Sequence, residues 1–169
     1  MTVTEETIEP HPGYRPCVGI FLLNTGGEVF VGLRADVRSN AWQLPQGGID
    51  PGEKPETAGL REMREEIGTD RAALLASSRV WRAYDLPPAL ARRMWSGRYR
   101  GQTQKWLAFR FEGSDADIRI DVEHAEFRAW RWQNPARLAG LVVPFKRDVY
   151  LSVVDEFRHL WDTGGHAGS

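Results

Sequence analysis

Short apolar and aromatic runs separated by turn residues make up most of the chain, and they predict β-strands. The run Arg15–Leu23 ends at turn residues that include Asn24 and two glycines. We therefore expect the next run, Glu28–Leu33, to pair back against it as a hairpin. Runs rich in aromatic or β-branched residues predict three further strands, at Arg79–Leu86, Lys105–Glu112 and Phe127–Trp132.

Two segments carry apolar residues at helical spacing. Pro55–Ile67 places Leu60, Met63 and Ile67 at i, i+3 and i+7, with Pro55 suited to a first helical turn and Gly68 to a C-terminal stop. A second helix is expected over Phe145–Trp161, where four apolar residues share one face: Val149, Val153, Phe157 and Leu160. The order of strands and helices predicts an α/β domain in which helices pack against a mixed sheet.

The composition is that of one globular domain. The chain has 169 residues, of which 41% are hydrophobic and 27% charged, enough to bury a core unaided. We expect a single domain over residues 13–161, between polar, flexible ends at residues 1–12 and 162–169. No apolar run approaches the roughly 20 residues of a membrane-spanning helix, and we expect no secretory signal, because no basic stretch followed by an apolar one occurs near the start. The single cysteine, Cys17, excludes an internal disulfide and fits a cytoplasmic location.

The candidate chemistry lies in the segment Gly47–Gly68, which reads GGIDPGEKPETAGLREMREEIG. On a helix, Glu62, Glu65 and Glu66 share one face, and like charges at that spacing cost about 0.2–0.5 kcal/mol per pair. Arg61 reaches only Glu65 by helical spacing. A hard divalent cation such as Mg²⁺, which prefers oxygen ligands, would make the cluster tolerable. A solvated acidic helix face is the plain alternative.

The complete spacing resembles the Nudix box, G-x5-E-x7-R-E-U-x-E-E-x-G-U, where U is a bulky aliphatic residue. The matching residues are Gly47, Glu53, Arg61, Glu62, Met63, Glu65, Glu66 and Gly68. Chance agreement at seven fixed positions is on the order of 10⁻⁸ per starting position. Thr69 stands where the box, at residues 47–69, has its last aliphatic residue, a departure that touches no chemical position.

Five other segments resemble the bacterial branch of the Nudix family that contains RNA pyrophosphohydrolases and the related diadenosine polyphosphate hydrolases. They are GYRPCVGI, WQLPQGGI, GQTQKW, EFRAWRW and FKRDVY. The resemblance implies a single-domain α/β/α sandwich with the box as a loop–helix–loop. It also implies an enzyme that hydrolyses phosphoanhydride bonds with Mg²⁺ or Mn²⁺.

The resemblance also implies roles for the box residues. Those implied to bind metal are Glu62, Glu65, Glu66, the Gly47 carbonyl and Glu126 of the later EFRAW segment. One of the glutamates is implied to accept the proton of the attacking water, and Arg61 to orient Glu53 or Glu65. Clustered metal ions suit this chemistry, because phosphoanhydride hydrolysis needs charge neutralisation and a positioned water. For Glu126, which lies in an acidic patch, a solvated loop position is an equal alternative.

The segment Ala89–Leu107 carries five basic and no acidic residues, interleaved with Trp95, Tyr99 and Trp106. This mixture is typical of single-stranded nucleic acid binding, whereas a solvated loop with core aromatics is the alternative, favoured for Trp106. The resemblance implies that five residues contact a 5′-triphosphate and the first bases: Arg15, Arg34, Lys105, Phe145 and Lys146.

Three functions therefore stand beside one another. The first, and the expected one, is removal of pyrophosphate from 5′-triphosphorylated RNA to prime mRNA decay. The second is hydrolysis of dinucleoside polyphosphates such as diadenosine tetraphosphate, which present the same polyphosphate. The third is a catalytically silent nucleotide- or RNA-binding module, a role that the intact glutamate set argues against.

Overall fold

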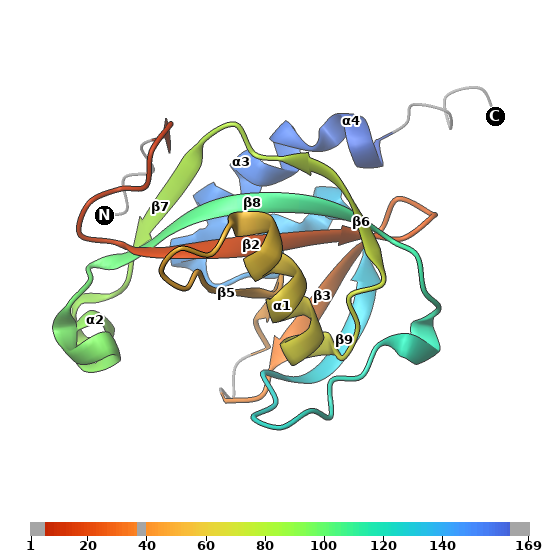
Figure 1. The fold of residues 1–169 in the computed structure, drawn as a ribbon, viewed down its shortest axis with the longest axis horizontal. Helices are drawn as coiled ribbons and strands as arrows, with labels where there is room; N and C mark the ends of the chain where they lie inside the picture. Colours follow the sequence, from red (N-terminus) through yellow and green to blue (C-terminus); the bar gives the residue numbers. More distant parts are fainter. Residues whose placement is uncertain (1–5, 37–39, 163–169) are drawn as a thin grey trace.

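The computed structural model describes residues 6–36 and 40–162, and their strands form one hydrogen-bonded sheet (Figure 1). The strands are β1 (Glu6–Thr7), β2 (Arg15–Leu23), β3 (Val29–Arg34), β4 (Trp42–Gln43), β5 (Gln46–Gly48), β6 (Ala72–Ser77), β7 (Trp81–Asp85), β8 (Gly101–Phe111) and β9 (Phe127–Gln133). The helices are α1 (Pro55–Ile67), α2 (Pro88–Arg93), α3 (Arg147–Glu156) and α4 (Arg158–Trp161). Short 3-10 helices include η1 (Met94–Gly97), η3 (Pro135–Gly140) and η4 (Pro144–Lys146).

The centre of the sheet is the parallel pair β2 and β8, which runs from Arg15 opposite Gln102 to Leu23 opposite Arg110. β6 and β7 pair with β8 in the antiparallel direction. β5 pairs with the first half of β2, and β3 pairs with β4 and β9. The sheet is therefore mixed, as the sequence predicts.

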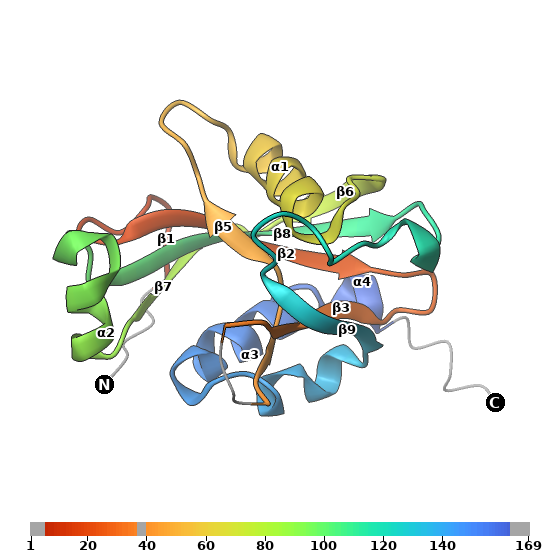
Figure 2. The ribbon, with the colours of Figure 1, turned by 90° about the horizontal axis from the view of Figure 1, so that it is seen from below.

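Helices cover both faces of this sheet, with α1 on one side and α3 on the other (Figure 2). Met63 and Ile67 of α1 share a buried cluster with three alternate residues of β2: Val18, Ile20 and Leu22. Val149 and Val153 of α3 share a second cluster with Phe21 and Leu23, the intervening residues of β2, and with Trp106 of β8. Because side chains alternate across a strand, β2 supplies both cores. The predicted α/β/α sandwich is confirmed.

The predicted hairpin of Arg15–Leu23 and Glu28–Leu33 is confirmed, but its paired part is short. β2 and β3 are joined by a turn, but their pairing is confined to Leu23 opposite Val29. The two strands then separate, because β2 takes β8 and β5 as neighbours while β3 takes β9 and β4. Turn residues fix where a chain reverses, but the long-range partners decide how far the strands stay together.

Other element boundaries also differ from the predictions. β8 begins at Gly101 rather than Lys105, because the polar residues before Lys105 are buried within the sheet and carry no hydrophobic pattern. The predicted helix Phe145–Trp161 is divided into η4, α3 and α4, with a break at Phe157. β6 and α2 were not predicted; β6 reads AALLAS, which has no β-branched or aromatic residue.

Part of the N-terminal segment that was predicted to be flexible is paired. Glu6 and Thr7 form β1 opposite Arg82 and Trp81 of β7, and Glu6 accepts a hydrogen bond from Ser152 at 2.8 Å. An open strand edge can accept so short a strand without any hydrophobic signal. Residues 1–5, and all of the predicted tail except Asp162, lie outside the described residues. Among residues 6–36 and 40–162, no helix has the length and apolar composition needed to span a bilayer.

Candidate active site

The glutamates of α1 are positioned by the loop that precedes the helix. Pro55 begins the helix, and Gly68 ends it with φ of 76° and an N–H bond to the Arg64 carbonyl at 3.1 Å. The preceding loop closes on itself, since the Asp50 N–H donates to the Glu53 carboxylate at 3.0 Å. Local signals thus suffice to fix the ends of this helix and the return of Glu53 toward it.

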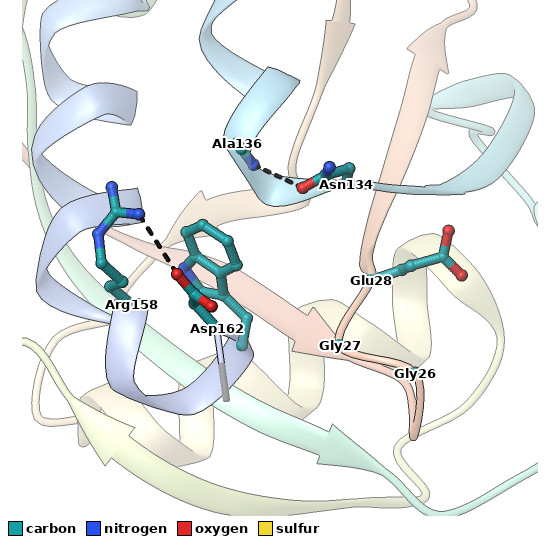
Figure 3. A pocket seen from close by; sticks show the side chains of 8 residues that line it. Gly26, Gly27, Glu28, Asn134, Ala136, Arg158 and Asp162 are labelled. Carbon is teal, nitrogen blue, oxygen red and sulfur yellow. Dashed lines mark hydrogen bonds and ion pairs between the residues drawn. The ribbon is translucent and has the colours of Figure 1, made fainter. Parts of the chain in front are cut away.

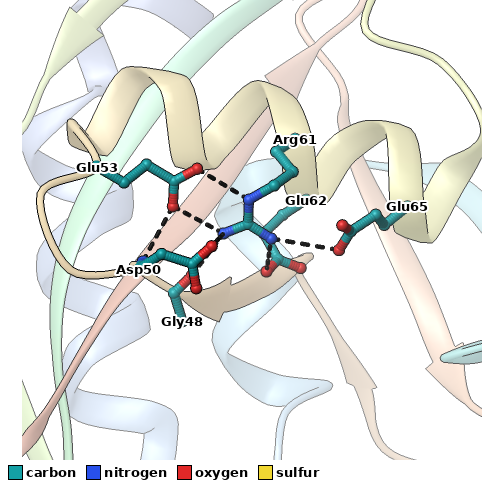
Figure 4. A network of polar contacts seen from close by, with 6 residues as sticks. All are labelled: Gly48, Asp50, Glu53, Arg61, Glu62 and Glu65. Carbon is teal, nitrogen blue, oxygen red and sulfur yellow. Dashed lines mark hydrogen bonds and ion pairs between the residues drawn. The ribbon is translucent and has the colours of Figure 1, made fainter.

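Arg61 is the hub of the site (Figure 4). Its Nε and Nη2 donate to the two oxygens of Glu53 at 2.9 Å, and Nη2 also donates to the Gly48 carbonyl at 2.9 Å. Its Nη1 donates to Glu62 at 2.9 Å and to Glu65 at 3.3 Å. The hydrogen bonds from Arg61 lower the pKa of Glu53 to about 2, so Glu53 is a fixed anion. Arg61 therefore joins the loop to the carboxylates of the helix.

Glu66 lies deepest in the cluster. It is 9% exposed, and its Oε2 atom has no hydrogen-bond partner among the described residues. Burial, together with the neighbouring Glu62 and Glu126, raises the pKa of Glu66 well above its ordinary value. Burial likewise raises the pKa of Glu62, whereas Glu65 is more than half exposed. A buried anionic oxygen without a donor is costly, and a cation would relieve that cost.

The glutamates of this cluster suit a hard divalent cation, because their carboxylates offer oxygen ligands. Within residues 6–36 and 40–162, no three His, Cys, Asp or Glu side chains form a ready-made metal-binding group. Two of the carboxylates, those of Glu62 and Glu65, pair with Arg61 instead. Binding a cation would therefore involve rotation of these side chains.

Two adjacent glycines of β5, Gly47 and Gly48, lie between the two sides of the site, one on each face of the sheet. A Cβ built on Gly47 would lie 2.0 Å from the carboxyl carbon of Glu62, and one on Gly48 would lie 2.3 Å from Nη2 of Arg15. Gly47 is opposite Val18 and Gly48 is opposite Cys17, so the two point to opposite faces of the sheet. The absence of side chains here lets Glu62 approach from the α1 face and Arg15 from the α3 face.

An acidic pocket of about 590 Å³ opens beside α1. We use this name for the pocket lined by Glu62, Arg64, Glu65, Glu66, Val122, Glu123, His124 and Glu126. The structure thus brings Glu126, far away in the sequence, to the three glutamates of the helix. The predicted roles of these four residues remain predictions, but they now share one pocket.

A second pocket, of about 430 Å³, lies on the α3 side of β5. This basic pocket is lined by Arg15, Arg34, Asp36, Gln43, Gln46, Gly47, Tyr84, Leu86, Leu90, Met94, Trp95, Gln102, Glu126, Phe145 and Lys146. Four of the five residues predicted to contact substrate are among them. Glu126 lines both pockets, so the acidic cluster and the basic pocket adjoin.

Lys105 is the predicted substrate residue that the structure places elsewhere. It lies opposite Val18 in the parallel pair, on the face that carries α1, while its neighbour Trp106 is fully buried on the α3 face. The alternation of side chains along β8 therefore separates Lys105 from the basic pocket. The burial of Trp106 agrees with the core interpretation favoured by the sequence.

Several residues of the basic pocket were missed by the sequence analysis. Gln104 donates to Gln46 at 2.7 Å and to Gln102 at 3.0 Å, and accepts from the indole N–H of Trp106 at 3.1 Å. These amides tie β8 to β5 behind the pocket. The run GQTQKW was noted only as a resemblance; its alternating glutamines on one strand face were the available signal.

Lys146 is almost completely buried at the base of the basic pocket. It is 4% exposed, and its Nζ lies 3.3 Å from Oε1 of Gln43 and 5.6 Å from the ring centroid of Tyr84. Burial, assisted by the nearby charge of Arg34, lowers the pKa of Lys146 to about 8. The buried ammonium has few partners here and suits a phosphate ligand.

A larger cavity, of about 710 Å³, lies at the turn between β2 and β3, beside η3 and α4 (Figure 3). Arg158 lies 3.8 Å from Asp162 and stacks 5.0 Å from the Trp161 ring centroid. Asn134 caps η3 by accepting from the Ala136 N–H at 3.0 Å. The polar groups of this cavity thus stabilise the local structure, and none of the box glutamates lines it. Cavity size does not identify the reactive site.

Comparison with known proteins gives one consistent result. The NUDIX domain model matches residues 13–153. An RNA pyrophosphohydrolase of Roseobacter denitrificans is 52% identical over 157 residues, which cover 92% of this chain and 98% of that protein. One of Rhodospirillum rubrum is 57% identical over 143 residues, covering 85% of this chain and 86% of that protein.

The structural neighbours support the same architecture. A dihydroneopterin triphosphate pyrophosphohydrolase of E. coli matches with a TM-score of 0.61 and 19% identity, covering 85% of this chain and 98% of that one. An Ap4A hydrolase of C. elegans, in a binary complex, matches with a TM-score of 0.57 and 16% identity over the same shares. At these identities the matches establish the fold alone.

Proposed function

The chain belongs to the Nudix family, and on this premise we propose that it hydrolyses the 5′-triphosphate end of RNA, releasing pyrophosphate and leaving a 5′-monophosphate. The proposal is supported by sequence relatives, covered almost over their whole length, that carry the name RNA pyrophosphohydrolase. The role in mRNA decay and the cytoplasmic location remain predictions.

The observation that carries the proposal is the position of Glu126, which lines both the acidic pocket and the basic pocket. A triphosphate held by the cations of the basic pocket would reach the carboxylate cluster at this junction. Leu90, Met94 and Trp95 of the α2–η1 segment give the basic pocket one apolar wall, along which the nucleotides would follow. The arrangement suits a polyphosphate attached to a nucleotide chain.

Glu62, Glu65 and Glu66, with the Gly47 carbonyl, would hold a divalent cation, for which we propose Mg²⁺ with Mn²⁺ as a substitute. When bound, such a cation supplies charge neutralisation to the phosphoryl oxygens. Arg61 holds the Gly48 carbonyl at the end of β5 and the Glu62 carboxylate of the helix in fixed relative positions. These roles are part of the proposal.

Glu126 is our candidate for accepting the proton of the attacking water. It is exposed, and its carboxylate is not among those that Arg61 holds. Arg15, Arg34 and Lys146 would bind the phosphates, and Phe145 would stack on a base.

The direct test is turnover, with Mg²⁺, of a short 5′-triphosphorylated RNA and of diadenosine tetraphosphate at equal concentrations, with products resolved by chromatography. We expect faster conversion of the RNA, to a 5′-monophosphate and pyrophosphate. Faster cleavage of the dinucleotide would assign the second candidate function. Turnover of neither substrate would favour the silent binding module.

Replacing Arg61 with lysine is expected to lower kcat/KM by about 10- to 50-fold, because lysine keeps the charge but cannot bridge Glu53, Gly48 and Glu62 together. The matched control is Arg71→Lys just beyond the same helix, where an exposed arginine pairs with Asp117 at 3.3 Å outside both pockets. Equal losses in both variants would show that Arg61 does not organise the site.

The activity should also fall at alkaline pH. A lysine carries its charge below its pKa, so Lys146 of the free enzyme becomes neutral as the pH rises through about 8, and kcat/KM for a polyanionic substrate should decline there. The variant Lys146→Arg remains charged and should lose this decline. A pH profile of the same shape in both proteins would exclude Lys146 as its source.

A further inference from the structure

Three successive residues of η1 adopt a left-handed backbone conformation at the rim of the basic pocket. Trp95 has φ of 50°, Ser96 has φ of 56° and Gly97 has φ of 73°. Residues other than glycine rarely adopt positive φ, and such conformations persist where the surroundings require them, often at ligand sites. For Trp95, the result is a large side chain that lines the basic pocket.

The Trp95 ring is held by two contacts. The Arg15 guanidinium lies 5.2 Å from its ring centroid, and the Tyr99 ring meets it edge-on at 5.8 Å. Arg15 in turn lies against Gly48, where a Cβ would be 2.3 Å from its Nη2 atom. The Trp95 ring on one side and the glycine backbone of β5 on the other therefore fix the position of the Arg15 guanidinium, which lines the same pocket.

The pocket presents aromatic rings from three separate elements, Tyr84 of β7, Trp95 of η1 and Phe145 of η4. Phe145 of η4 packs against Tyr84, with ring centroids 5.7 Å apart, and lies next to Lys146. Trp95 lines the pocket from η1, together with Leu90 and Met94 of the same α2–η1 segment. The apolar wall on this side is therefore supplied by residues 90–95, which the Nudix box does not include.

We infer that Trp95 is a nucleobase-binding residue, on which one of the first two bases of a single-stranded RNA stacks while Arg15 contacts a phosphate beside it. The inference rests on the proposed function and adds the part of the substrate that the α2–η1 segment recognises. Indole rings are good stacking partners for any base, and the adjoining cation suits the backbone charge. Free inorganic polyphosphate has no base and therefore could not stack on Trp95.

The test measures binding separately from turnover. A 3′-labelled, 5′-triphosphorylated RNA is titrated with protein in EDTA, and its fluorescence anisotropy gives Kd. The same RNA with abasic nucleotides at positions 1 and 2 is titrated in parallel. The variants are Trp95→Ala, Trp95→Phe and, as a matched control, Trp161→Ala at the distant cavity.

We expect Trp95→Ala to raise Kd for the normal RNA by about 5- to 100-fold, the loss of one base stack, while Trp95→Phe stays within about threefold of wild type. The abasic RNA should bind wild type more weakly and lose nothing further in Trp95→Ala. Trp161→Ala should bind both RNAs as wild type does. In turnover with Mg²⁺, Trp95→Ala should raise KM and leave kcat within about threefold.

Two outcomes would overturn the inference: an unchanged Kd in Trp95→Ala, or an equal loss for normal and abasic RNA, which would mean that Trp95 acts only by positioning Arg15. Failure of the proposed function has a different signature. There, wild type would not convert the RNA in Mg²⁺, whatever the anisotropy data show for Trp95.

Discussion

Glu66→Gln is expected to reduce kcat by a factor on the order of 10³ while leaving the fold intact. Glu66 is the most deeply buried carboxylate of the cluster, and its Oε2 atom has no hydrogen-bond donor among the described residues. An amide of the same size keeps the packing but removes the anionic oxygen offered to a cation. The measurement is steady-state turnover of the triphosphorylated RNA with Mg²⁺.

The same variant should be no less stable than wild type in EDTA. The raised pKa of Glu66 means that the folded protein binds this proton more readily than the unfolded chain. The stabilisation that this proton provides is complete below the pKa that Glu66 has in the unfolded chain. It is lost as the pH rises through the higher pKa that Glu66 has in the folded protein. Glu66→Gln should flatten that dependence. Addition of Mg²⁺ should raise Tm in wild type more than in the variant.

The matched control is Glu56→Gln, which removes an exposed carboxylate from the first turn of the same helix. It should retain nearly full activity and the same response to Mg²⁺. If Glu66→Gln kept a tenth or more of the wild-type kcat, Glu66 could not be a central metal ligand.

Gly47→Ala is expected to lower kcat/KM by about 100-fold, because the new methyl group would occupy the place of the Glu62 carboxylate. The obstacle is the end of a flexible side chain, so the fold should adjust by moving that carboxylate. Thermal denaturation should give a Tm within about 3 °C of wild type.

Gly140→Ala serves as the control, because a Cβ there meets nothing within 4 Å. Both activity and Tm should stay close to wild type in this variant. If Gly47→Ala lowered Tm by much more than about 3 °C as well as lowering kcat/KM, the result would argue for a packing role of Gly47 instead.

Local signals predicted α1 to the residue. Proline at its start, glycine after its end and apolar residues at helical spacing all lie within the helix itself or beside it. The common face of Glu62, Glu65 and Glu66 follows from the same periodicity. Their different burial does not, because it depends on what packs against the helix.

Long-range arrangement was harder to predict. The basic pocket joins Arg15 and Arg34 to Phe145 and Lys146 from the far end of the chain, and only the family resemblance connected them beforehand. That resemblance gave no strand register, so it included Lys105, which the alternation of β8 directs to the other face. The role of Trp95 depends on a backbone conformation that residue type does not indicate.

The parallel pairing of β2 with β8 also has a consequence for how the protein acquires its structure during synthesis. Arg15 must find Gln102, and Leu23 must find Arg110, before either core can close. When only the first half of the chain has been synthesised, every residue of the Nudix box is present, but β8, which pairs with β2 beneath the box helix, is not. Such distant pairing is slow to form. The nascent chain should therefore be sensitive to proteases until β8 has emerged, and the active site should appear late and all at once.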